Sequence, residues 1–286
     1  MKILNQQIFE NREAAALPGL MESGGLPALV SGLSGIHRVN LAAALYERLE
    51  LPLLIVCPDD SAAESFSRDL EAMTGEKVNT LYSRDFTFYS SLAASREAEQ
   101  KRLYVLNALR CGESPLTVAT VSALMQRTIP PQTLIKAAFT VKDGESCPPE
   151  ELERALVRCG YTRCEQVEGA GQFSRRGGIV DFFSPSYPEP VRIEFWGDDI
   201  DSMGFFDVKT QRRTESVEAC RILPAAESLA TLATGGTEAL TEALTAAADK
   251  CSRHKSSQQL RELEQTLRTD IERLRQNVKL EYADRY

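Results

Sequence analysis

The sequence of 286 residues predicts an α/β protein in three parts, and the order of its apolar runs carries this prediction. Over residues 1–137, strand-like runs alternate with helix-like stretches, which is typical of a parallel sheet. Over residues 138–224, short strand-like runs are separated by turn residues, which indicates a smaller, inserted α+β domain. Over residues 225–286, the apolar residues recur only at helical spacing, so a helical segment is expected to close the chain.

The first part contains two runs that predict strands. Residues 51–57 are apolar throughout and are followed by Pro58, as expected for a strand that is buried on both faces and ends in a turn. The second run covers residues 116–121. The helices predicted around them cover residues 40–49, residues 61–73 with Asp60 or Ser61 as the N-cap, and residues 95–110 with Leu103, Leu106 and Leu109 in the apolar stripe.

A loop with two glycines, Gly32 and Gly35, lies where a first strand would turn into the first of these helices. Its setting resembles G-x-x-x-x-G-K-[ST], the loop whose backbone amides hold phosphate groups. With Gly32 as the first glycine, His37 occupies the place of the second glycine, Arg38 that of the lysine and Val39 that of the Mg²⁺-binding hydroxyl. Each change removes a function, so we expect a degenerate P-loop NTPase-like domain that does not bind nucleotide. The alternative is an ATPase or helicase fragment with residual ATP binding.

The middle domain opens with a helix over residues 148–157, which Gly160 is expected to end. Strands are predicted over residues 179–183, 191–196 and 205–206. Turn residues between these strands favour antiparallel hairpins.

Within the strand over residues 191–196, apolar and polar side chains alternate with a period of two. If the face that carries Val191 and Phe195 is buried, the only tryptophan of the chain, Trp196, lies on the outer face beside Arg192. Tryptophan and arginine are the residue types most enriched at binding hot spots. The pattern leaves open that Trp196 packs as ordinary core. It also does not decide whether Arg175-Arg176 add positive charge to this surface or are simply solvated.

The composition excludes several classes of function. A net charge of −8 argues against a large phosphate-binding surface, because nucleic-acid affinity depends on clustered Lys and Arg. The seven cysteines are scattered, none forms a C-x-x-C pair, and only two histidines are present, so we expect no cofactor, no metal site and no catalytic residues. No apolar run approaches the roughly 18 residues that span a bilayer. We therefore expect a cytoplasmic protein without membrane contact.

In the last part, one apolar stripe runs along a long charged helix. A coiled coil is the alternative, but fewer than three to four heptads are present, which favours packing on the first domain. The stripe consists of Leu260, Leu263, Leu267, Ile271, Leu274 and Val278.

The middle domain and the residues after it contain several motifs: Gly171 to Phe183 with Arg176-Gly177-Gly178, Pro190 to Ser202, Phe206-Asp207, Thr210 to Arg213, and Leu223 to Glu227. These motifs resemble the N-terminal part of the bacterial transcription-repair coupling factors, which is itself similar to the excision-repair protein UvrB. The resemblance spans essentially the whole chain, and its Arg-Gly-Gly and Thr-Gln-Arg elements are highly specific.

The resemblance implies a docking module whose middle domain binds UvrA, the damage-recognition ATPase of excision repair. The docking residues of the family match Arg176, Arg192 and Trp196, and Trp196 replaces the phenylalanine common at its position. In full-length relatives, which the resemblance implies are ATP-dependent DNA translocases, RNA polymerase and DNA bind through other modules. The resemblance also implies an autoinhibitory contact, in which another part of the full-length protein masks the docking surface.

The chain departs from UvrB between Leu81 and Leu109. There Tyr82 to Ser90 run almost directly into a helix, which leaves little room for the long aromatic hairpin of UvrB. The translocase motifs of the full coupling factor are absent as well. We therefore expect that the chain by itself neither verifies damage nor hydrolyses ATP.

Overall fold

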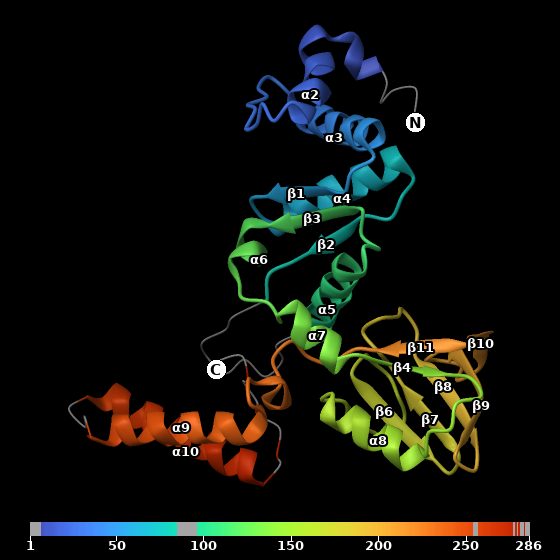
Figure 1. The fold of residues 1–286 in the computed structure, drawn as a ribbon, viewed down its shortest axis with the longest axis vertical. Coiled ribbons are helices and arrows are strands. Elements are labelled where there is room, and N and C mark those ends of the chain that lie inside the picture. Colours follow the sequence, from blue (N-terminus) through green and yellow to red (C-terminus); the bar gives the residue numbers. More distant parts are fainter. Residues whose placement is uncertain are drawn as a thin grey trace. The chain divides into compact units, whose positions relative to one another are not determined.

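The computed structural model describes residues 7–84, 96–253 and 257–276, together with residues 278, 280 and 283 (Figure 1). The chain forms two compact units, residues 1–127 and residues 128–286. The α/β prediction is confirmed, since one unit contains a parallel sheet and the other contains antiparallel sheets. The finer division at residues 137 and 224 stays a prediction.

The first unit is built on a three-stranded parallel sheet in the order β1-β3-β2. Its strands are β1 (Leu53–Cys57), β2 (Asn79–Leu81) and β3 (Leu116–Thr120). Its helical elements are η1 (Ile8–Glu10), α2 (Arg12–Glu22), α3 (Gly35–Leu49), α4 (Asp60–Thr74), α5 (Arg96–Cys111) and α6 (Val121–Met125). Leu116 of β3 packs with α3 and α4, whereas Ala119 packs with α5, so helices cover both faces of the sheet.

The structure corrects several of the sequence predictions for this unit. The strand that we expected to be buried on both faces is only half buried, because β1 is at the edge of the sheet and leaves Leu54 and Val56 exposed. The continuously buried strand is the central one, β3. The N-cap of α4 is Asp59, whose side chain accepts a hydrogen bond from the Ala62 N–H at 2.8 Å. Leu109 of the predicted apolar stripe is exposed.

The second unit contains a six-stranded sheet in the order β10-β9-β8-β7-β6-β5 and a separate β11-β4 pair. Neighbouring strands are antiparallel, except for the parallel pair of β5 and β6. The strands are β4 (Phe139–Lys142), β5 (Thr162–Arg163), β6 (Gln172–Arg176), β7 (Ile179–Phe182), β8 (Val191–Trp196), β9 (Asp199–Phe206), β10 (Arg213–Ser216) and β11 (Ala219–Ile222). The predicted strand at residues 205–206 is only the end of β9.

One face of this sheet packs against α8 (Pro149–Arg158) and the β11-β4 pair. Helix α7 (Pro131–Ala137) precedes these elements in the chain. Phe173, Val180 and Ile193 from three adjacent strands are fully buried there, together with Leu152 and Leu156 of α8. Each such side chain stabilises the fold by about 1.5–3 kcal/mol relative to an exposed one. The core therefore fixes which face of the sheet is left for solvent and partners.

The remaining elements are η2 (Ala230–Leu232), α9 (Gly236–Arg253) and α10 (Gln258–Arg275). Helices α9 and α10 lie side by side (Figure 1) and pack through Leu244 of α9 and Leu267, Ile271 and Leu274 of α10. The apolar stripe of α10 thus has a partner within this helical pair, although Leu263 is exposed. Packing of the segment on the first domain stays a prediction. Among the described residues, no helix combines the length and the hydropathy needed to cross a bilayer.

Candidate functional site

The sheet of the second unit has an outer face, which we define as the face turned away from α8 and the core. Phe173, Val180 and Ile193 point into the core, so the residues next to them in sequence point outward. Strand register aligns the outward residues in two rows across the sheet. One row is Ser174, Asp181, Arg192 and Gly204, and the next is Arg176, Ile179, Glu194 and Ser202.

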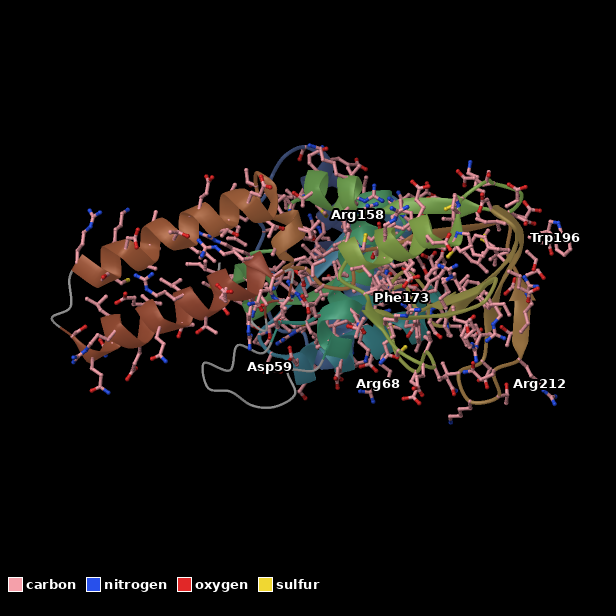
Figure 2. The ribbon with its side chains drawn as sticks, turned by 90° about the horizontal axis from the view of Figure 1, so that it is seen from below. Asp59, Arg68, Arg158, Phe173, Trp196 and Arg212 are labelled. Atoms are coloured by element: carbon pink, nitrogen blue, oxygen red, sulfur yellow. The ribbon has the colours of Figure 1, made fainter. Side chains whose placement is uncertain are left out.

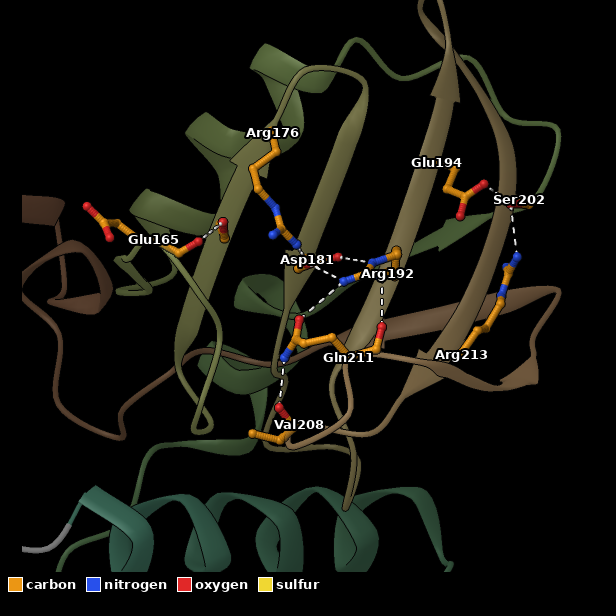
Figure 3. Close-up of polar contacts among 10 residues, drawn as sticks. Glu165, Arg176, Asp181, Arg192, Glu194, Ser202, Val208, Gln211 and Arg213 are labelled. Carbon is orange, nitrogen blue, oxygen red and sulfur yellow. Dashed lines mark hydrogen bonds and ion pairs between the residues drawn. The ribbon is translucent and has the colours of Figure 1, made fainter.

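Asp181 lies at the centre of the outer face and is almost completely buried, with 2% of its side chain exposed. Its Oδ1 accepts a hydrogen bond from Arg192 Nε at 2.7 Å. Its Oδ2 accepts from Arg192 Nη2 at 2.9 Å and from Arg176 Nη2 at 2.8 Å (Figure 3). One carboxylate therefore holds both arginines that the sequence predicted for the docking site.

Arg192 contacts Asp181, Gln211 and Phe206 through its guanidinium, and only 16% of its side chain is exposed. Besides the two bonds to Asp181, Nη1 donates to the Gln211 carbonyl at 3.2 Å and Nη2 to Gln211 Oε1 at 3.4 Å. Its guanidinium carbon also lies 4.6 Å from the ring centre of Phe206. The hydrogen bond to Asp181 raises the pKa of Arg192 above its ordinary value.

The two arginines before the Gly-Gly turn point to opposite faces of the sheet. Arg176 is on the outer face, and 54% of its side chain is exposed. Arg175 faces α8, where it pairs with Glu150 and Glu153. The hydrogen bond that Arg175 donates to Glu150 raises the pKa of Arg175 and lowers the pKa of Glu150. Arg175 therefore adds no charge to the outer face.

Trp196 is at the end of β8 and is exposed over 84% of its surface, so the alternative that it packs as core is wrong (Figure 2). A tight turn follows it, in which Gly197 has a φ of 65°. The N–H of Cys147 donates to the Asp198 carbonyl at 2.8 Å and holds this turn. A bulge in β8-β9 pairing after Glu194 precedes the turn. The only tryptophan of the chain is thus displayed on an anchored hairpin.

Side chains at the start of α3 form hydrogen bonds with the loop around Gly32. Ser34 Oγ lies 2.7 Å from His37 Nδ1, and Arg38 Nε donates to the Leu33 carbonyl at 3.2 Å. The expected strand before the loop is absent, because residues 25–34 contain no strand, and the following helix begins at Gly35 rather than at residue 40. The side chains at the positions of the lost lysine and glycine are therefore bonded locally, and Val39 is buried in the core of the unit.

Three other predictions concern the segment of the UvrB hairpin, metal binding and the cysteines. Asp85 to Ser90, in the segment where we expect no long hairpin, lie outside the described residues. Within residues 7–84, 96–253 and 257–276, no three His, Cys, Asp or Glu side chains are grouped so that they could hold a metal ion. The seven cysteines are free thiols, and burial raises the pKa of Cys159 to about 11 and that of Cys220 to about 12.

The region that carries the outer face is similar to a known family. Residues 139–227 match the family model of the UvrB interaction domain. The matched region contains Arg176, Asp181, Arg192 and Trp196. It begins with β4 and ends shortly after β11.

The longer alignments confirm the resemblance to transcription-repair-coupling factors. The chain is 32% identical to that of Bacillus subtilis over 222 residues, 34% to that of Myxococcus xanthus over 208 residues and 30% to that of Escherichia coli over 203 residues. These alignments cover 77%, 70% and 71% of the chain. They cover only 19%, 17% and 18% of the relatives, so the chain spans less than a fifth of their length.

Sequence reasoning missed the residues that organise the site. Asp181 was not singled out, although it is an acid in the otherwise apolar run Ile179 to Phe182, which is a signal for a buried, paired carboxylate. Gln211 was noted only as part of a motif. Its φ of 58° places it in the left-handed region, and this turn aims its carbonyl and side chain at Arg192.

Proposed function

We propose that the chain is a non-catalytic docking module that binds UvrA through the outer face of its UvrB interaction domain. The observation that carries this proposal is the exposed Trp196 beside a face that displays Arg176 and Arg192 within a domain of this family. A large apolar side chain with adjacent arginines is typical of an interface hot spot.

The similarity to transcription-repair-coupling factors supports a place in transcription-coupled excision repair, as one part of a longer DNA translocase. In that assembly the module recruits UvrA to stalled RNA polymerase, while other parts bind the polymerase and DNA. The cytoplasm, where these partners act, is the expected location.

The direct test measures binding of UvrA to the purified chain by calorimetry. We expect Arg176→Ala, Arg192→Ala and Trp196→Ala together to weaken binding by at least about 2 kcal/mol, roughly thirtyfold in Kd. The matched control is Arg154→Ala with Val157→Ala, because both residues are exposed on α8, on the opposite side of the sheet. Wild-type affinity in the triple variant would exclude this surface.

Tryptophan fluorescence gives a second readout. Trp196 is exposed in the free chain, so its emission should be that of a solvated indole and should shift to shorter wavelength when UvrA covers it. A Trp196→Phe variant supplies the baseline for the tryptophans of UvrA. An unshifted difference spectrum at saturation would show that UvrA binds elsewhere.

Non-catalytic behaviour has its own test. The local bonds of His37 and Arg38 support a loop that does not receive phosphate. Titration with ATP and Mg²⁺ should give no saturable heat at micromolar concentrations. Saturable binding would instead favour the ATPase-fragment alternative.

Masking of the docking surface is the remaining part of the proposal. A full-length protein that contains this chain should bind UvrA more weakly than the chain alone, because another module covers the outer face. Equal affinities of the two proteins would contradict masking.

A further inference from the structure

The two arginines of the outer face differ in how much of their hydrogen-bonding capacity is available. A guanidinium carries five N–H donors. Within the described residues, Arg192 directs its Nε, Nη1 and Nη2 groups at Asp181 and Gln211. Arg176 uses only Nη2, in its bond to Asp181, while Nε and Nη1 make no hydrogen bond with described residues.

Burial separates the two arginines in the same way. The side chain of Arg192 is 16% exposed and that of Arg176 is 54% exposed. Arg192 has only one N–H left, on Nη1, so a partner that took two parallel hydrogen bonds from it would have to break a bond to Asp181 or Gln211. Loss of a bond to Asp181 would leave a buried carboxylate short of donors. Arg176 can bind a partner while it keeps its bond to Asp181.

Arg192 also joins the sheet to the loop over residues 207–212. Gln211 accepts from Arg192 twice, and its own Nε2 donates to the Val208 carbonyl at 2.8 Å. The Thr210 N–H donates to Asp207 Oδ1 at 2.7 Å and closes the loop. The conformation of this loop therefore depends on a side chain in the middle of the sheet (Figure 3).

We propose that Asp181 and Arg192 are positioning residues that brace the outer face, and that Arg176 is the arginine that touches the partner, where it binds a carboxylate. This inference rests on the proposed function, since it divides the roles within the same docking surface. Two arginines around one aspartate give the cluster a net charge of +1, which fits an acidic side chain of UvrA. A carboxylate can take two parallel hydrogen bonds from the donors that Arg176 has left.

Arginine footprinting of the wild-type chain tests the division without any variant. The chain is treated with phenylglyoxal, alone and with saturating UvrA, and modification is located by mass spectrometry. We expect Arg176 to react in the free chain and to be protected by UvrA, and Arg192 to stay unreactive in both samples. Reaction of Arg192 in the free chain with protection by UvrA would overturn the proposal.

A double-mutant cycle tests whether Asp181 acts through Arg176. Asp181→Asn should weaken UvrA binding by about tenfold in the wild-type background, because a misplaced guanidinium loses much of its bond to the carboxylate. In the Arg176→Ala background, the same substitution should change Kd by less than about threefold. A merely structural role of Asp181 would give equal losses in both backgrounds, and that result would overturn the proposal.

The outcomes separate this inference from the docking function. If the wild-type chain does not bind UvrA, or if Trp196→Ala leaves Kd unchanged, the proposed docking surface fails and the inference fails with it. If Trp196→Ala weakens binding but the cycle is additive, only the division of roles fails. Circular dichroism and thermal unfolding of each variant establish that it is folded, and Arg176→Lys, which retains the charge but not the fork, should recover part of the affinity lost in Arg176→Ala.

Discussion

Replacing Asp181 with asparagine should destabilise the second unit, and the structure sets the size of the effect. The carboxylate is buried and accepts three charge-assisted hydrogen bonds, two from Arg192 and one from Arg176. Removing one partner of a buried ion pair typically costs about 3–5 kcal/mol, because the other charge stays buried and unpaired.

Three features of the site reduce this cost. Arg176 is half exposed, so water can replace its lost bond. Arg192 keeps the two oxygens of Gln211 as acceptors. The asparagine amide retains one oxygen that can accept a hydrogen bond. We therefore expect the free energy of unfolding to fall by about 2–3 kcal/mol, which a domain with a stability of about 5–15 kcal/mol can lose without unfolding.

Urea unfolding followed by circular dichroism measures this difference. Tryptophan fluorescence is unsuitable, because Trp196 is already exposed in the folded state. Hydrogen exchange of peptides that cover β7 and β8 assigns the loss to the second unit. The matched control is Asp201→Asn, an exposed aspartate on β9, which should change stability by less than about 0.5 kcal/mol. A loss in Asp181→Asn no larger than that of the control would refute the reasoning.

Three further predictions concern the same unit. Gly204→Ala should cost about 1–3 kcal/mol in urea unfolding, since a Cβ would collide with the backbone carbonyl oxygen of Glu215 as well as with Nε of Arg213. Tyr161→Phe should cost about 1–2 kcal/mol in the same assay, because the buried Leu223 carbonyl loses its 2.8 Å hydrogen bond. Burial raises the pKa of Cys220 to about 12, whereas an unfolded thiol ionises near about 8.5, so stability should fall above that pH by about 1.4 kcal/mol per unit.

Each of these predictions has a contradicting result. Gly169→Ala is the control for the glycine variant, because a Cβ there meets no atom within 4 Å, and equal losses in both variants would exclude the collision. An unchanged stability of Tyr161→Phe would show that water satisfies the carbonyl. For the thiol, stability is retained below about pH 8.5 and lost above it. The free energy of unfolding of a Cys220→Ala variant should therefore fall less steeply with pH than that of the wild type between about pH 8.5 and 12. Equal slopes would contradict the assignment.

Much of the fold was readable from the sequence, because it depends on short-range patterns. The alternation of apolar runs and helical stretches predicted the parallel sheet of the first unit, and β1, β3 and α8 lie close to their predicted ranges. The period of two in residues 191–196 correctly placed Val191 and Ile193 in the core and Arg192 on the other face.

The predictions that were wrong concern features that depend on which strands are neighbours in a sheet. Residues 51–57 have the composition of a buried strand, but position in a sheet is a tertiary property, and β1 is at the edge of its sheet. The loop around Gly32 has glycines at suggestive places, yet no strand leads into it. Local sequence cannot reveal either fact, because both depend on which segments pair with each other.

The sequence by itself determined which side chains share a face: parity along the strands put Arg192 and Trp196 together and, as the register now shows, puts Arg176 and Asp181 with them. Only the tertiary structure decided what those side chains do there. Exposure of Trp196 follows from an anchored hairpin, and the buried bond network of Arg192 follows from Asp181 on the neighbouring strand and from Gln211 in a later loop. Asp181, Arg192 and Gln211 are distant along the chain and come into contact only when the sheet has formed. The tertiary structure therefore decides which arginine is available to a partner and which one positions the others.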